Sequence, residues 1–264
     1  MSIPDLPPPN KRLGQNFLID PNIVRKIVAL AELGPGDHVF EIGPGRGILT
    51  EALCHAAGRV TAVELDPRLH AYLATRQAEL PNGELVCEDA LAYPVESLPM
   101  GTIVVANLPY YISTPLLFKL LEQRGRFPRM VLMLQAEVAD RLVAKPGGSD
   151  YGVLSVMAQY AADITKSFRV SAQCFRPRPD VAPAVVLLRA KEHARLSQHD
   201  EAAFRALVKA AFAHRRKTLV NSLRDEGYDL HAVVETMQRL EIAPARRAET
   251  LSVEDFLRLA LALG

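Results

Sequence analysis

The first two thirds of the chain alternate between short apolar runs and segments with apolar residues at helical spacing. Helical spacing covers residues 21–33, 48–57 and 113–121. Strands that are apolar throughout are typical of a parallel sheet covered on both faces, so this pattern predicts a doubly wound α/β sheet built of βαβ units. The predicted strands are His38–Ile42, Arg59–Leu65, Glu84–Cys87, Thr102–Ala106 and Met130–Leu134.

The last part of the chain has a different pattern. From Asp200 to Gly264 the apolar positions indicate helices only, interrupted at Gly227 and Pro244. We therefore expect an α/β domain over residues 1–193 and a small all-α domain over residues 194–264.

Composition limits the class of protein. Of the 264 residues, 49% are hydrophobic and 23% charged, which predicts a folded chain with a sizeable core. The cysteines Cys54, Cys87 and Cys174 stand singly, and the seven histidines lack metal-ligand spacing, so we expect neither disulfides nor a metal site. The start is proline-rich without an apolar core, and no apolar run reaches the ~18 residues of a membrane span. We expect a soluble, cytoplasmic protein.

A glycine-rich turn and several carboxylates follow the predicted strands. Gly43, Gly45 and Gly47 come directly after the first strand, where a doubly wound sheet binds nucleotide-like ligands. Their spacing differs from the GxGxxG of dinucleotide enzymes. Glu64 ends the second strand, where an acid can accept hydrogen bonds from a ribose.

Further acids are predicted at the same edge of the sheet, namely Glu41, Asp66 and Asp89. Clustered carboxylates disfavour a ligand with phosphates and suit one with a cationic centre, such as the sulfonium and ammonium of S-adenosylmethionine. The pattern therefore favours a methyl donor over NAD, and it disfavours an NAD-dependent oxidoreductase.

The turn Asn107-Leu-Pro-Tyr110 follows the fourth strand and lies at the same predicted edge. An adenine amine is a poor nucleophile because its lone pair is delocalised into the ring. The Asn107 amide oxygen and the Leu108 carbonyl can accept its two hydrogens and localise that lone pair, while Pro109 stiffens the turn. Tyr110 offers a face on which a splayed base can stack. These residues indicate methyl transfer to adenine N6.

Taken together, the motifs resemble those of the rRNA adenine N6,N6-dimethyltransferase family, and specifically its small-subunit type. This family has a Rossmann-like class I S-adenosylmethionine-dependent methyltransferase domain and a helical domain. The resemblance rests on Gln15-Asn-Phe-Leu18, Phe40-Glu-Ile-Gly-Pro-Gly45, Val63-Glu-Leu-Asp66, Asn107-Leu-Pro-Tyr-Tyr-Ile-Ser-Thr114, Phe175-Arg-Pro-Arg-Pro179 and Phe212-Ala-His-Arg-Arg-Lys-Thr-Leu-Val-Asn-Ser-Leu223.

The resemblance implies roles for individual residues. The donor would be bound by Asn16, Leu18, Gly43, Glu64, Asp89 and Asn107. Asn107, Leu108 and Pro109 would be catalytic, with Tyr110 and Phe175 sandwiching the target base. Leu108, where DNA adenine methyltransferases commonly have Pro, would leave room for a monomethylated amine to react again. The implied reaction is dimethylation of two adjacent adenosines in the 3′-terminal hairpin of small-subunit rRNA, by a monomer acting on a pre-assembled small subunit.

One stretch departs from the family. After Phe175-x-Pro-x-Pro the usual continuation is Lys-Val-Asp-Ser, whereas this chain has Asp180-Val-Ala-Pro183. An acid thus replaces a cation close to the expected base pocket, which puts the RNA contact of that lysine in doubt.

Cations gather instead in the last third of the chain. Residues 1–164 carry 14 Lys+Arg and 18 Asp+Glu, whereas residues 165–264 carry 17 and 12, so the net charge of +1 hides a polarised distribution. Arg215, Arg216 and Lys217 are interleaved with apolar residues and are expected to contact rRNA phosphates.

Two alternatives remain open. An erythromycin-resistance methyltransferase shares the Gln-Asn-Phe-Leu and Asn-x-Pro-Tyr patterns but modifies large-subunit rRNA. A ribosome-assembly factor without catalysis would retain RNA binding, although such chains often erode the glycine-rich or Asn-x-Pro-Tyr motifs, and both are intact here.

Overall fold

The computed structural model describes residues 6–10, 13–191, 196–214 and 216–264. Two compact units are present: Met1–Ala139 with Ala162–Glu192, and Asp140–Ala161 with His193–Gly264. The described part of the first unit is an α/β fold, and the described part of the second is helical.

The first unit contains a seven-stranded sheet with the order β4-β3-β2-β5-β6-β9-β7. The first five of these strands are parallel, while β9 is antiparallel to both β6 and β7. The strands are β2 (His38–Ile42), β3 (Arg59–Glu64), β4 (Gly83–Cys87), β5 (Ile103–Asn107), β6 (Arg129–Gln135), β7 (Ala162–Arg169) and β9 (Pro183–Ala190).

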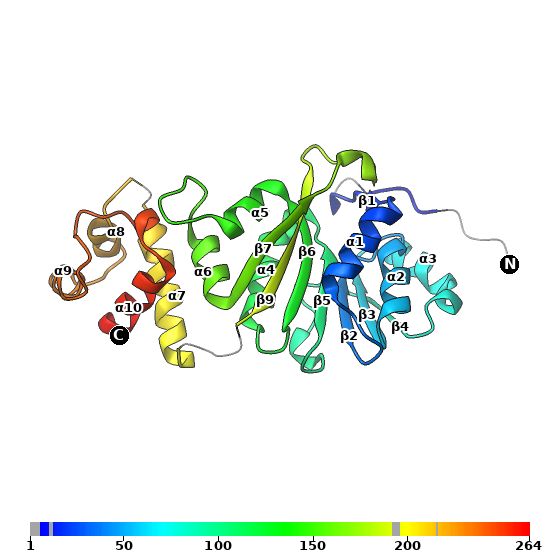
Figure 1. Cartoon of the computed structure of the whole chain (residues 1–264), viewed down its shortest axis with the longest axis horizontal. Coiled ribbons are helices and arrows are strands. Elements are labelled where there is room, and N and C mark those ends of the chain that lie inside the picture. The colour runs from blue at the N-terminus through cyan, green and yellow to red at the C-terminus, as the bar shows by residue number, and fades with distance from the viewer. Residues whose placement is uncertain (1–5, 11–12, 192–195, 215) are drawn as a thin grey trace. The chain divides into compact units, whose positions relative to one another are not determined.

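Helices cover both faces of this sheet (Figure 1). Helices α1 and α2 pack on one face, where buried Ile27 and Leu53 join Val39 of β2 in one apolar cluster. On the other face the Tyr93 ring stacks on Phe40 at 5.3 Å. The helices that belong wholly to the first unit are α1 (Pro21–Ala31), α2 (Ile48–Ala56), α3 (Pro67–Thr75) and α4 (Ser113–Glu122).

The order of the strands creates a crevice for a ligand. The chain continues from β2 to β3 and β4 on one side of β2, and then returns to form β5 on its other side. At such a switch point the loops after neighbouring strands diverge, and ligands bind at the carboxyl ends of the strands. The predicted motifs at residues 43–47 and 107–110 follow β2 and β5, the two strands that flank this point.

A two-stranded antiparallel ladder joins the N-terminal segment to the segment after residue 174. Strand β1 (Phe17–Leu18) pairs with β8 (Phe175–Arg176), with Phe17 opposite Arg176 and Leu18 opposite Phe175. This pairing brings together two of the sequence motifs that are far apart along the chain.

The division into units differs from the expected domains. One crossing lies between residues 192 and 193, next to the expected boundary, but residues 140–161 belong to the helical unit and not to the α/β unit. The physical reason is aromatic packing: the Tyr160 ring lies 4.7 Å from that of Phe204, and Tyr151 contacts Phe212 edge to face at 6.2 Å. The helices of this unit are the second half of α5 (Ala136–Val143), α6 (Val153–Ala161), α7 (Gln198–Phe212), α8 (Leu219–Asp225), α9 (Leu230–Arg239) and α10 (Val253–Leu263).

Within the described residues, no helix is both long and apolar enough to cross a membrane.

Candidate active site

The glycine-rich turn after β2 is stabilised by backbone hydrogen bonds, and its glycines have positive φ angles. Gly43, Gly45 and Gly47 have φ angles of 70°, 60° and 85°, which glycine adopts without a steric penalty. The Gly43 N–H donates to the Val63 carbonyl at 2.9 Å. A Cβ on Gly43 would lie 3.8 Å from the Asn107 carbonyl oxygen, so this turn runs directly beside the end of β5.

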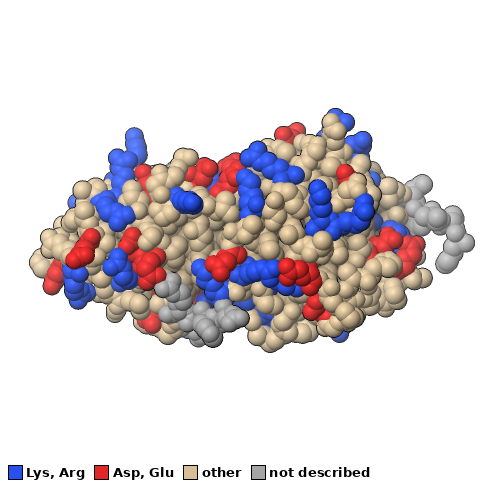
Figure 2. All heavy atoms as spheres, in the orientation of Figure 1, with Lys and Arg blue, Asp and Glu red and all other residues tan. Residues whose placement is uncertain are grey.

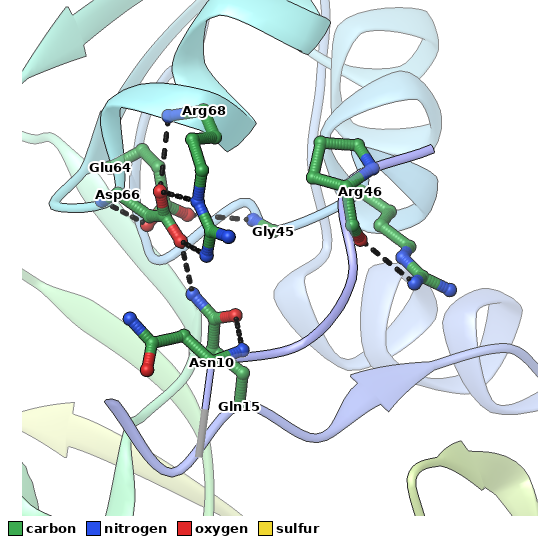
Figure 3. A network of polar contacts seen from close by, with 8 residues as sticks. Asn10, Gln15, Gly45, Arg46, Glu64, Asp66 and Arg68 are labelled. Carbon is green, nitrogen blue, oxygen red and sulfur yellow. Dashed lines mark hydrogen bonds and ion pairs between the residues drawn. The ribbon is translucent and has the colours of Figure 1, made fainter. Parts of the chain in front are cut away.

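The Glu64 carboxylate links this turn to the end of β3 (Figure 3). Its Oε2 accepts the Gly45 N–H at 3.0 Å, and its Oε1 accepts the Asp66 N–H at 2.9 Å. Only 6% of Glu64 is exposed, and burial raises its pKa although the two N–H donors act in the opposite direction. Each oxygen retains lone-pair capacity for a ligand, because an ionised carboxylate has about four acceptor positions.

Neighbouring Asp66 binds the N-terminal segment to the same edge. The Gln15 amide donates to Asp66 Oδ2 at 3.1 Å, and its Oε1 accepts the Asn10 N–H at 2.7 Å. The Arg68 guanidinium donates to both Asp66 oxygens and, as the main cause, lowers the pKa of this carboxyl to about 2. Asp66 is therefore ionised across the physiological pH range.

Arg46 forms a second attachment of the N-terminal segment. Its Nη2 donates to the Pro7 carbonyl at 3.1 Å, and its guanidinium carbon lies 4.3 Å from the centre of the Phe17 ring. The N-terminal segment is thus attached to the glycine turn and to the end of β3 by residues before and after Leu13.

The Asn107–Tyr110 turn begins where β5 ends. The Leu108 N–H donates to the Met133 carbonyl at 3.0 Å, which extends the pairing of β5 with β6 by one bond. The Asn107 amide approaches the Asn16 carbonyl at 3.4 Å, while the Tyr110 hydroxyl donates to the Val181 carbonyl at 3.4 Å. The turn therefore contacts both the N-terminal segment and the segment that precedes β9.

One open cavity is lined by these elements together. Nine of the predicted site residues line it: Asn16, Leu18, Gly43, Glu64, Asp89, Asn107, Leu108, Pro109 and Tyr110. The structure thus brings the predicted donor-binding residues and the Asn-Leu-Pro-Tyr turn to one place.

Phe175 does not belong to this cavity wall. Its side chain is 1% exposed and packs in the core cluster with Leu18, its partner in the β1–β8 ladder. In this arrangement the Phe175 ring has no free face for a base, so the structure does not form the expected sandwich with Tyr110. The clamping role of Phe175 remains a prediction.

The predicted basic segment lies in the helical unit. Arg215 lies outside the described residues, and Arg216 is exposed. Lys217 forms an ion pair with Asp225, which also pairs with Arg224 at 3.0 Å. Acids therefore offset part of this positive charge, and on the face shown in Figure 2 basic and acidic side chains are interspersed.

Two residues line the cavity for which the sequence predicted no individual role. Tyr111 lines the cavity and is half exposed; its pKa is raised by burial and, to a lesser degree, by the charges of Asp89 and Glu64. Glu41 lines the cavity and is 1% exposed, and its Oε2 has no hydrogen-bond partner among the described residues. Burial raises the pKa of Glu41 to about 8. The position of Glu41 in a strand predicted its edge location but not its degree of burial.

No group of three or more His, Cys, Asp or Glu side chains in the described ranges is arranged to hold a metal ion.

A doubly wound sheet with a glycine turn, an acidic strand end and an Asn-Leu-Pro-Tyr turn around one cavity defines a class of enzyme. It is the Rossmann-like class I methyltransferase fold, here accompanied by a helical unit.

Comparison with known proteins identifies the family. Residues 8–263 match the model of the family "Ribosomal RNA adenine dimethylase". The chain is 44% identical to "Ribosomal RNA small subunit methyltransferase A" of Moorella thermoacetica, over 97% of this chain and 92% of the relative. The protein of the same name from Chlamydia abortus is also 44% identical, over 95% and 90% of the two chains. The chain belongs to the ribosomal RNA adenine dimethylase family, and it is an S-adenosylmethionine-dependent rRNA adenine dimethyltransferase.

Solved structures agree with this assignment. A dimethyladenosine transferase from Plasmodium falciparum superimposes with a TM-score of 0.81 and 29% identity, covering 92% of this chain and 95% of the other. The 23S rRNA methyltransferase ErmE superimposes with a TM-score of 0.73 and 27% identity, covering 94% and 99%. In both comparisons the structural similarity therefore covers more than nine tenths of this chain.

The buried carboxyl of Glu41 leads to a prediction about stability. Its pKa is about 8 in the folded protein, against an ordinary value of 4.5, so the folded state favours the neutral form. This contribution to stability is fully present below about pH 4.5 and is lost as the pH rises through about 8. We expect the free energy of unfolding of the wild type to fall relative to Glu41→Gln over this window, by at most about 1.4 kcal/mol per pH unit.

Urea unfolding of both proteins at pH 5, 7 and 9 measures this difference. Parallel pH profiles for the wild type and Glu41→Gln would show that Glu41 is not held neutral by burial.

Proposed function

We propose that this chain dimethylates the N6 amines of two adjacent adenosines in the 3′-terminal hairpin of small-subunit rRNA. It would act in the cytoplasm as a monomer, on rRNA within a pre-assembled small subunit, and without a metal ion. The family and the printed names of its 44%-identical relatives support the small-subunit target. The observation that carries the proposal is that the Asn107–Tyr110 turn opens into the same cavity as Glu64 and Asp89.

The cavity fits S-adenosylmethionine. A buried carboxyl oxygen without a partner, such as Glu41 Oε2, suits a ligand that brings a hydrogen-bonding cation, and this donor carries an ammonium group, whose charge would favour the ionised form of Glu41 on binding. Glu64 would hold the ribose hydroxyls with its remaining lone pairs, and Asp89 would accept from the adenine amine. Asn16, Leu18 and Gly43 would line the rest of the donor site. When bound, S-adenosylmethionine supplies an electrophilic methyl group.

The Asn107 turn would prepare the target amine. The Asn107 amide oxygen accepts one amine hydrogen and the Leu108 carbonyl accepts the other, so the nitrogen lone pair is localised and aimed into the cavity. Pro109, with φ −59° and ψ 131°, holds the carbonyl in place. Tyr110 supports the face of the base, and its phenol stays neutral because burial raises its pKa to about 12. Proton loss follows methyl-group gain, so no strong general base is required.

The helical unit would bind the rRNA outside the target nucleotide. Arg216 is exposed, and Lys217 can exchange its ion pair with Asp225 for a phosphate. Arg215, which lies outside the described residues, is also expected to contact phosphate. The alternative target is large-subunit rRNA. This chain shares its fold with the 23S rRNA methyltransferase ErmE but is only 27% identical to it, so this target has less support than small-subunit rRNA.

Methyl transfer to isolated ribosomal subunits tests this function. Unmethylated small subunits and large-subunit precursors are incubated separately with the chain and labelled S-adenosylmethionine, and N6,N6-dimethyladenosine is mapped. We expect label in the small-subunit 3′-terminal hairpin; label in large-subunit RNA alone would contradict the proposal.

Asn107→Ala should lose at least 100-fold in transfer because it removes an acceptor used in the transition state. Its affinity for S-adenosylhomocysteine should fall much less than its rate of transfer, and transfer at the wild-type rate would overturn the role given to Asn107.

Leu108 is proposed to leave room for the second methylation. Its side chain is 1% exposed and lines the cavity, so the more rigid ring of Leu108→Pro should raise the ratio of monomethyl to dimethyl product. Proline also removes the N–H that donates to Met133, which is expected to slow both steps, so the product ratio is the readout and not the rate. Leu108→Ala retains the N–H and adds room, and it should form dimethyladenosine as the wild type does. An unchanged ratio in Leu108→Pro would count against the role of Leu108.

A further inference from the structure

The segment between β8 and β9 lies between two walls of the cavity. At its start, Arg176 pairs with Phe17 across the β1–β8 ladder. At its end, the Val181 carbonyl accepts the Tyr110 hydroxyl at 3.4 Å. Because Phe17 and Tyr110 both line the cavity, residues 176–181 pass close to its mouth.

The ladder also determines the side of β8 on which Arg176 lies. Residues directly opposite each other in an antiparallel pair share one face, and successive residues alternate between the faces. Leu18 and Phe175 occupy the face that packs into the core. Phe17 and Arg176 therefore share the other face, where a Cβ on Gly45 would lie 3.1 Å from the Phe17 ring. Arg176 is thus on the side of the glycine turn.

Arg176 and Arg178 are both exposed, and neither forms an ion pair with any residue that the structure describes. Among the residues that the structure describes, the Arg176 guanidinium donates one hydrogen bond, to the Phe175 carbonyl. Several other exposed arginines of this unit are ion-paired, as Arg59 is with Glu84 at 2.7 Å and Arg189 with Glu32 at 2.6 Å. Even with exposed Asp180 in the same segment, residues 176–180 retain a net positive charge beside the cavity.

Resting on the function proposed above, we infer that Arg176 and Arg178 bind the backbone phosphates that flank the target adenosine. A base that reaches Asn107 and Tyr110 brings a phosphate on each side of its sugar, and these phosphates must lie near the mouth of the cavity. An arginine fork is suited to phosphate oxygens, and neither fork here forms an ion pair with an acid that the structure describes. These two arginines would supply the RNA contact that is expected of the family lysine, which Asp180 replaces in this chain.

The salt dependence of binding to unmethylated small subunits tests this inference. The double variant Arg176→Gln/Arg178→Gln is compared with the control Arg59→Gln/Arg189→Gln, which removes the same charge from exposed, ion-paired positions of the same unit. Two lost phosphate contacts should make the slope of log K against log salt shallower by roughly 1.4–1.8 in the double variant, with little change in the control. Asp180→Lys should make the slope steeper by about 0.7–0.9.

A second readout separates RNA contact from damage to the donor site. Affinity for S-adenosylhomocysteine should be the same in the double variant, the control and the wild type, whereas the KM for small subunits should rise at least tenfold in the double variant alone. Equal salt slopes in the double variant and the control would overturn the inference while leaving the proposed function intact. Failure of the wild type to bind or methylate small subunits would overturn both.

Discussion

The buried carboxylate of Glu64 determines the shape of the active site. Its two oxygens accept the N–H groups of Gly45 and Asp66, so one side chain fixes both the glycine turn after β2 and the turn after β3. An unpartnered buried carboxylate would cost several kcal/mol, and these two donors offset that cost while the other lone pairs stay available. The donor cavity is therefore already formed by the chain itself, because the group expected to bind the ribose also holds the walls in place.

The N-terminal segment depends on this arrangement through Asp66. Burial raises the pKa of Glu64, whereas Arg68 lowers that of Asp66 to about 2, so two carboxylates two residues apart have different environments and tasks. The ionised Asp66 anchors Gln15, and Gln15 in turn receives the Asn10 N–H. Residues 13–18 thereby form one wall of the cavity, and the Asn107–Asn16 contact joins this wall to the Asn107 turn.

The sequence predicted the features that depend on residues close together along the chain. Each of the five predicted strands agrees with the structure to within a residue at either end, and the glycine turn, Glu64 and Asn107 share one cavity because loops after parallel strands meet at one edge. Long-range packing was not predictable in this way. Phe175 is buried by its pairing with Leu18, some 157 residues earlier, and residues 140–161 join the helical unit through contacts such as Tyr160 with Phe204. The antiparallel strands β7 and β9 also complete the sheet beyond the predicted units.

The dependence of the donor site on Glu64 is tested most directly by the affinity of Glu64→Gln for S-adenosylhomocysteine. Glutamine has the same shape but only one acceptor oxygen, so its NH₂ group must face either the Gly45 or the Asp66 N–H, donor against donor. The turn would be displaced and the ribose would lose one acceptor oxygen. Isothermal titration calorimetry should show affinity weakened at least tenfold, which corresponds to about 1.4 kcal/mol. An affinity equal to that of the wild type would contradict the account.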